Sequence, residues 1–209
     1  MPGAHDTREA LRRTALAMFC QRGYDAVTVA QVARAANVSH MTFFRHFPTK
    51  EAVVVADLFD PVIAAAVAAQ PREWAPLRRA VHGLVAALDD DAARGELESV
   101  EFRERVMLAA STPSLRAAVR AASLATEEAI AAALGSALGS SLGGGSGGGS
   151  GGVLAAGAAG SGALAARAAA AATMGAATAI LLTWAADGAH SDPAAGLRAG
   201  LLSLLEETS

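Results

Sequence analysis

Two short helices separated by a tight turn are the feature that most constrains how this chain can fold. Thr28 stands three residues before a glutamine, which is the spacing of a capping box at a helix start. Asn37 tolerates the left-handed backbone of a turn, and Ser39 can cap the helix that follows. Because Pro48 disfavours helical backbone at the residue before it, this second helix must end near Phe47.

Helical periodicity continues along the rest of the chain, and no alternating strand pattern occurs. Of the 209 residues, 53% are hydrophobic but only 4% are aromatic. Alanine supplies much of that fraction, which favours packed helices over a β-sandwich. The sequence therefore predicts an all-α fold of about nine helices. Besides the two short ones, they are a helix from Asp6 to Gly23, one from Thr49 onward with a kink at Asp60–Pro61, and helices over 77–92, 95–110, 113–138, 162–187 and from 193 onward.

The sequence contains two segments of low complexity, of which the first carries no site chemistry. Residues at about 140–161 are rich in Gly, Ser and Ala, so we expect a flexible loop, whether natural or an engineered tether. Residues 168–186 hold no charge and are about as long as a bilayer-spanning helix. Their alanines and glycines are weakly hydrophobic and no basic flank follows, so we expect no membrane span.

Charge is unevenly distributed along the chain. Residues 1–50 carry a net charge of +4, and the remainder carries −7. A basic N-terminal quarter on an acidic body suggests a polyanionic partner for the first part, although random scatter of surface charge gives the same count. The single cysteine, Cys20, excludes an internal disulfide framework, and no secretory leader opens the chain. We therefore expect a cytoplasmic protein.

The two short helices have the proportions of a helix-turn-helix, whose second helix lies in the major groove of DNA. The run from Leu11 to Val53 resembles the N-terminal domain of the TetR family of transcriptional regulators. The positions that carry the resemblance are Ala15, Phe19, Gly23-Tyr24, Thr28-Val29, Val32-Ala33, Ala36, Val38-Ser39, Thr42-Phe43-Phe44, His46-Phe47 and Lys50-Glu51.

The resemblance implies a DNA-binding role for the exposed residues of this segment, whereas Phe43 and Phe47 anchor it in the core. Base reading falls to His40, Met41, Thr42 and Arg45, and backbone contacts to Thr28, Ser39, Thr42, His46 and Lys50. At Phe44 the family usually has a tyrosine, whose hydroxyl commonly binds a phosphate. This chain lacks that hydroxyl, and Arg45 beside it is positioned to compensate.

The resemblance also implies a domain division and partners. Residues 1–50 would form a three-helix DNA-binding domain, and residues 51–209 a six-helix body for ligand binding and dimerisation. A homodimer would bind a palindromic operator in double-stranded DNA, usually as a repressor, and a small-molecule effector would release it. Asp60–Pro61 is the predicted hinge. The expected effector-pocket residues are Phe59, Trp74, His82, Phe102, Arg105 and Met107, and the expected dimer-interface residues are Trp184, Leu197, Leu201 and Leu204.

Enzymatic chemistry finds no support in the sequence. The histidines lack any H-x-x-x-H or H-E-x-x-H spacing, and the glycine-rich segment lacks the strand and helix that frame a phosphate loop. We therefore expect no catalytic set, no metal and no cofactor. The alternative is a helical ligand-binding or scaffold protein without sequence-specific DNA binding. Salt distinguishes the two, because DNA binding weakens steeply as salt rises.

Overall fold

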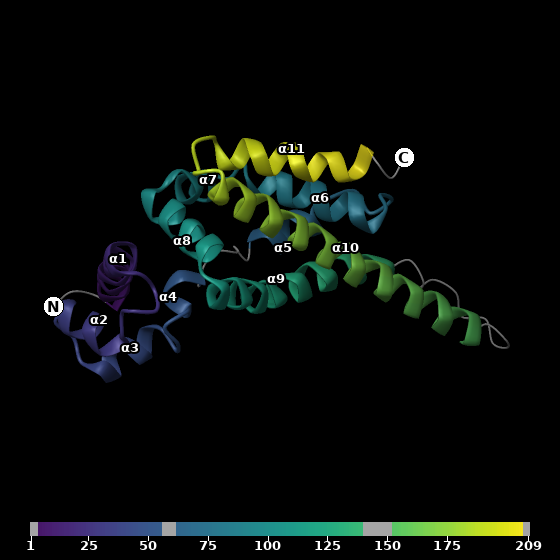
Figure 1. Ribbon diagram of the computed structural model, residues 1–209. Helices are drawn as coiled ribbons and strands as arrows, with labels where there is room; N and C mark the ends of the chain where they lie inside the picture. The colour runs from purple at the N-terminus through teal and green to yellow at the C-terminus, as the bar shows by residue number, and fades with distance from the viewer. Residues whose placement is uncertain (1–3, 56–61, 140–151, 207–209) are drawn as a thin grey trace. The chain divides into compact units, whose positions relative to one another are not determined.

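The computed structural model describes residues 4–55, 62–139 and 152–206, and the regular structure in these ranges is entirely helical (Figure 1). The all-α prediction is confirmed. The described ranges hold eleven helices: α1 (Ala4–Arg22), α2 (Val29–Ala35), α3 (His40–His46), α4 (Ala52–Val55), α5 (Val62–Ala68), α6 (Pro76–Ala87), α7 (Asp91–Glu98), α8 (Val100–Ser111), α9 (Pro113–Gly139), α10 (Gly152–Ala186) and α11 (Pro193–Glu206).

The expected count of about nine helices was wrong for two reasons. The predicted helix after Thr49 is described as α4 and α5, and its kink at Asp60–Pro61 lies outside the described residues. The predicted helices over 77–92 and 95–110 are three helices, because two polar side chains cap new starts. A carboxylate oxygen of Asp90 accepts the Ala92 N–H at 2.9 Å before α7, and the Ser99 hydroxyl accepts the Phe102 N–H at 3.0 Å before α8.

The predicted starts and ends of the two short helices are confirmed by their capping contacts. The Thr28 hydroxyl accepts the Gln31 N–H at 3.3 Å while the Gln31 side chain accepts the Thr28 N–H at 2.9 Å, which completes the capping box. Asn37 has the expected positive φ of 55°. Helix α3 ends at His46, directly before Phe47. One start was wrong: α1 begins at Ala4, and Asp6 lies inside its first turn, where a carboxylate favours the helix dipole.

The predicted glycine-rich loop at about 140–161 does not extend over residues 152–161, which are helical. Helix α10 already begins at Gly152, and residues 140–151 lie outside the described ranges. Alanines alternate with the glycines after residue 152, and their helix propensity outweighs the cost of the glycines.

The chain divides into two compact units. The first comprises residues 1–58, 96–122 and 182–191, and the second comprises 59–95, 123–181 and 192–209. In the first unit, α1 contacts α2, α4 and α8. Its core is built around Leu11, Phe19, Phe43, Phe47 and Val53, each at most 1% exposed.

A buried arginine ties α4 to α8 within the first unit. Arg105 is fully buried, and its Nε donates to the Val54 carbonyl at 2.7 Å. One terminal nitrogen of the same guanidinium donates to the Glu96 carboxylate at 2.8 Å. This arginine therefore joins the helix that follows the short-helix segment to α8.

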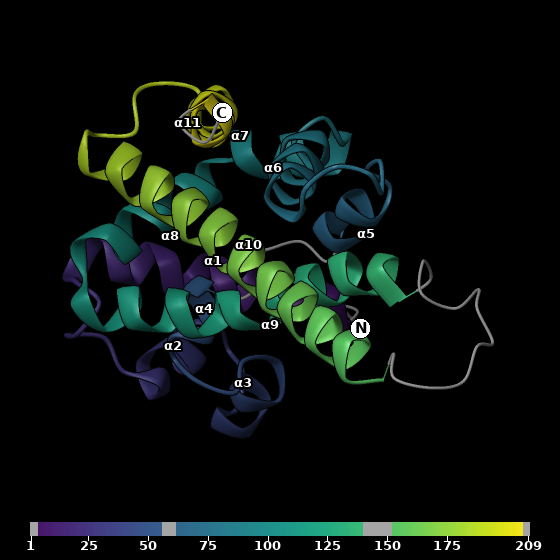
Figure 2. The same cartoon turned by 90° about the vertical axis from the view of Figure 1, so that its right-hand side faces the viewer.

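In the second unit, α5 and α11 both pack on α6 (Figure 2). Gly83 of α6 permits the close approach of α5, because a Cβ there would lie 2.5 Å from the Cα of Val67. Leu197 and Leu201 of α11 are buried. Arg198 of α11 donates to the Asp89 carboxylate at 2.6 Å.

Candidate nucleic-acid interface

The two short helices α2 and α3 meet across a turn that the sequence specifies locally. Helix α2 contacts both α1 and α3, and it buries Val32 and Ala33. Helix α3 buries Phe43, and Phe47 at its C-cap is likewise fully covered. These apolar anchors fix the inner face of α3, so its other side chains point away from the core.

The outer face of α3 presents three side chains to solvent near its start and end. His40 and Arg45 are exposed, and Met41 is 78% exposed. Phe44 is 38% exposed, and its ring lies 4.8 Å from the His40 ring in an edge arrangement. Phe44 therefore packs against the His40 imidazole.

The residues that cap α2 and α3 are also exposed to solvent. Thr28 and Ser39 are both exposed. The Ser39 hydroxyl accepts the Thr42 N–H at 3.0 Å, and the two hydroxyl oxygens of Ser39 and Thr42 are 2.8 Å apart. Thr42 and His46 are half-buried. The structure therefore keeps the predicted set on one short segment, with Met41, His40 and Arg45 its most open members.

Lys50 differs from the rest of the predicted set because its ammonium points inward. Its Nζ donates to the Tyr24 carbonyl at 2.5 Å and lies 3.9 Å from the centroid of the Tyr24 ring. Burial lowers the pKa of Lys50, while the charges of Asp25 and Glu51 act in the opposite direction. A phosphate contact by Lys50 would have to share the ammonium with the Tyr24 carbonyl.

The sequence did not reveal that Tyr24, the residue that Lys50 contacts, is hydrogen-bonded to Glu51. The Tyr24 hydroxyl donates to the Glu51 carboxylate at 2.9 Å. Burial, and then the hydrogen bond to Glu51, raises the pKa of Tyr24. Burial raises the pKa of Glu51, but hydrogen bonds from its own backbone, Tyr24 and Thr49 lower it below the usual value on balance. Both residues belong to the quoted resemblance, but their separation in sequence gives no sign of a pair.

The described members of the predicted effector-pocket set belong to both compact units. Phe59 lies outside the described residues. Trp74 and His82 belong to the second unit, where their ring centroids are 4.9 Å apart. The other three belong to the first unit: Phe102 and Arg105 are buried, and Met107 is 42% exposed. The structure therefore divides this prediction into two groups.

Most of the predicted dimer-interface residues are covered by their own chain. The Trp184 indole donates to the Ser191 carbonyl at 2.9 Å, and its side chain is only 9% exposed. Leu197 and Leu201 are 4% and 0% exposed, and Leu204 is half-buried. Trp184, Leu197 and Leu201 therefore stabilise the single chain and present little surface to a partner.

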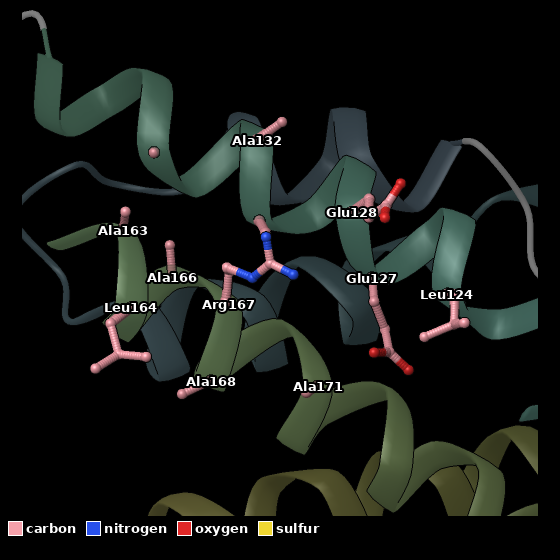
Figure 3. Close-up of a pocket in the computed structure, with 12 residues that line it drawn as sticks. Leu124, Glu127, Glu128, Ala132, Ala163, Leu164, Ala166, Arg167, Ala168 and Ala171 are labelled. Atoms are coloured by element: carbon pink, nitrogen blue, oxygen red, sulfur yellow. The ribbon is translucent and has the colours of Figure 1, made fainter. Parts of the chain in front are cut away.

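A groove between α9 and α10 presents apolar surface instead (Figure 3). Its volume is about 610 Å³, and it lies within the second unit. Leu124 and Leu164 in its walls are 54% and 70% exposed. Arg167 extends from α10 toward α9 in the same groove, where α9 carries Glu127 and Glu128.

Comparison with known proteins agrees with this geometry. Residues 11–56 match the family model described as bacterial regulatory proteins, tetR family. The HTH-type transcriptional regulator TcmR of Streptomyces glaucescens is 37% identical over 116 residues, which span 53% of this chain and 51% of that protein. The match therefore covers about half the length of this relative.

Solved structures extend the likeness over the fold. NalD, described as the secondary repressor of the MexAB-OprM multidrug efflux pump in Pseudomonas aeruginosa, has a TM-score of 0.54 at 17% identity, covering 97% of this chain and 95% of that one. FadR of Thermus thermophilus, solved in complex with lauroyl-CoA, has a TM-score of 0.48 at 22% identity, covering 95% of this chain and 93% of that one. Residues 11–56 of this chain therefore match the tetR family of bacterial regulatory proteins, and about half of the chain is similar to the transcriptional regulator TcmR.

Proposed function

We propose that this chain regulates transcription by binding a palindromic operator as a homodimer and releasing it when a small molecule binds. The observation that carries this proposal is the outer face of α3, where His40, Met41 and Arg45 stand exposed over a core fixed by Phe43 and Phe47. A helix of this kind places its side chains against base edges in the major groove. NalD is described as a repressor, and repression is the mode we propose here.

Each exposed residue has a distinct expected role at the DNA. Arg45 can direct its guanidinium fork at O6 and N7 of a guanine. His40, held by the Phe44 ring, reads a second base, and Met41 and Thr42 add apolar contact. Thr28, Ser39 and His46 contact the phosphate backbone and set the register. In this scheme Phe44 acts through His40, and Lys50 acts mainly by holding Tyr24.

Replacing Arg45 or His40 with alanine should relax sequence preference at one operator position each. We expect each change to cost about 1–3 kcal/mol in binding to the preferred site, because a base contact is lost while phosphate contacts remain. Gel-shift titration on the preferred site and on single-base variants measures this. Arg116→Ala, an equal loss of charge at an exposed site on α9, is the matched control. Equal effects of Arg45→Ala and Arg116→Ala would contradict base reading by α3.

The dependence of binding on salt separates this function from a helical scaffold. Log affinity should fall linearly with log salt, with a slope of about −0.9 for each phosphate neutralised on duplex DNA. A scaffold that retains the head without using it would show no specific binding to lose. The same function places the protein in the cytoplasm, where the operator would lie.

We place the dimer interface on the groove between α9 and α10. One copy of α3 reads only a few base pairs, and a two-fold dimer supplies a second recognition helix one DNA turn away. Within the described part of the chain, one helix, over residues 160–186, is long and apolar enough to cross a membrane, a test that core helices of soluble proteins also pass. Only 33% of its most apolar window is buried in the single chain, which suits coverage by a second copy.

Charges in the groove suit a two-fold contact. The same patch of each copy meets itself across a two-fold axis. Arg167 of one copy can then approach Glu127 or Glu128 of the other, while Leu124 and Leu164 lose water. The groove thus offers apolar area and opposite charges on one surface.

Leu164→Glu should convert the dimer to monomers in sedimentation velocity. A carboxylate on this exposed leucine would be desolvated in the interface beside glutamates, which costs several kcal/mol. Val100→Glu is the matched control, because Val100 is 71% exposed and belongs to the first unit, outside the groove. We expect that variant to sediment like the unmodified protein. A dimer that persists in Leu164→Glu would place the interface elsewhere.

A further inference from the structure

Arg79 of α6 is a buried arginine, and no anionic side chain among the residues that the structure describes pairs with it. Only 3% of its surface is exposed. Its Nε is buried without a hydrogen-bond partner. One terminal nitrogen makes a long hydrogen bond of 3.4 Å to the Leu134 carbonyl. A guanidinium has five N–H donors, so most of its binding capacity is not used by the groups described around it.

No carboxylate of the described residues pairs with this guanidinium. Helix α5 has the sequence VIAAAVA and carries no charge. Helix α11 contributes Arg198, which is already paired with Asp89, and Glu206, which is exposed at the end of the helix. Burial, and then the like charge of Arg72, lowers the pKa of Arg79. Within the described residues, the electrostatic environment of Arg79 is therefore that of a desolvated cation beside a second cation.

An unpaired buried charge is costly, and packing does not require one here. Burying an ion costs several kcal/mol unless a counter-charge and hydrogen bonds compensate. An apolar side chain of similar length would remove that cost. The neighbouring residues Ala80 and Val81 on the same helix are apolar and fully buried. A site that gives up stability in this way is typical of residues kept for binding.

We propose that Arg79 recognises the anionic group of a small apolar ligand, such as a carboxylate. The guanidinium fork matches a carboxylate or a similar oxyanion in two parallel hydrogen bonds. His82 stands one helical turn after Arg79 on α6, and its ring is paired with that of Trp74. We assign contact with the apolar body of the ligand to these rings. The inference rests on the proposed function in one respect: it names the chemical class of the effector.

A pair of fluorescent probes that differ by one charge tests this inference. The first is 1-anilinonaphthalene-8-sulfonate, and the second is N-phenyl-1-naphthylamine, which has the same aromatic rings without the sulfonate. Arg79→Met should weaken binding of the sulfonate by about 10–100-fold, the loss expected for a charge-assisted hydrogen bond. Binding of the neutral probe should change less than about threefold. Arg79→Lys, which keeps the charge but not the fork, should give an intermediate loss.

A matched control separates recognition from general surface charge. Arg78→Met removes an equal charge from the same helix, but Arg78 is exposed and lies over the Trp74 ring. We expect it to leave the preference for the sulfonate unchanged. Equal losses in both variants, or equal losses of both probes in Arg79→Met, would overturn the proposal.

The stability of the same variant provides a second readout. Because Arg79→Met removes an unpaired buried charge, its unfolding temperature without probe should equal or exceed that of the unmodified protein. A lower unfolding temperature with unchanged probe preference would make Arg79 structural and overturn the proposal. Binding of operator DNA without probe should be unchanged. If neither the unmodified protein nor Arg79→Met binds operator DNA, the proposed regulatory function is wrong. The pair of probes still decides whether Arg79 binds anions.

Discussion

Phe47→Ala should destabilise the protein by about 3–5 kcal/mol, the cost of truncating a fully buried phenylalanine. The Phe47 side chain is 0% exposed, and its ring centroid lies 5.9 Å from that of Phe43. The guanidinium groups of Arg8 and Arg12 lie over the same ring at 4.8 and 5.5 Å. Removing the ring leaves a cavity and takes the support from both arginines. Urea denaturation followed by circular dichroism measures the loss.

Phe44→Ala is the matched control for this prediction. It removes the same side chain from α3, at whose C-cap Phe47 lies, but Phe44 is 38% exposed. We expect it to cost at most about 1 kcal/mol in stability, because much of the ring is already in water. It should nevertheless weaken DNA binding, since the His40 ring loses its neighbour. Equal destabilisation by the two changes would contradict the division of α3 into a buried and an exposed face.

Arg105→Met should be the next most damaging substitution, at about 2–4 kcal/mol of stability. The change removes the donor to the Val54 carbonyl in a fully buried position, and an unsatisfied buried carbonyl carries a desolvation penalty. It also leaves Glu96 without the charge at 2.8 Å. The midpoint of urea unfolding should fall while its slope stays constant.

An exposed arginine on the same helix controls for charge and length. Arg103→Met makes the same change on α8 at an exposed position. We expect an effect within about 0.5 kcal/mol, as is typical of surface substitutions. If the two arginine variants unfolded at the same urea concentration, the hydrogen bond from Arg105 to the Val54 carbonyl would contribute nothing measurable to the free energy of unfolding.

The helix-turn-helix could be predicted from the sequence because its signals are local. A capping box at Thr28, an asparagine with positive φ at residue 37 and a hydroxyl cap at Ser39 each act over three or four residues. Phe43 and Phe47 at helical spacing then identify the inward face of α3. Each of these signals survives tertiary packing, so the predicted positions were confirmed.

The polar contacts inside the protein could not be predicted because they join residues far apart in sequence. Lys50 was expected at the phosphate backbone, but its ammonium binds the Tyr24 carbonyl, 26 residues away. Arg105 was expected in a ligand pocket, but it reaches the Val54 carbonyl 51 residues away. When its partner is not known, an arginine in a helical pattern is interpreted as a surface residue or as a ligand contact.

The helices after residue 51 were harder to interpret, because their many alanines do not distinguish a buried face from an exposed one. Leu197 and Leu201 formed a clear apolar face, which the sequence alone could not assign to a partner or to the protein's own core. The structure assigns it to the core. The exposed Leu164 lies in a stretch of alanines, where a single large residue produces no periodicity. Its place in a groove became clear only from the packing of α9 and α10.

Selection of bound DNA from a random pool tests the central claim most directly. The protein should enrich a palindrome whose half-sites lie about one helical turn apart, roughly 10 base pairs between centres. The same selection with Arg45→Ala should lose preference at one symmetric pair of positions while keeping the spacing. Enrichment of no motif, or of a motif that Arg45→Ala and His40→Ala leave unchanged, would contradict DNA reading by α3.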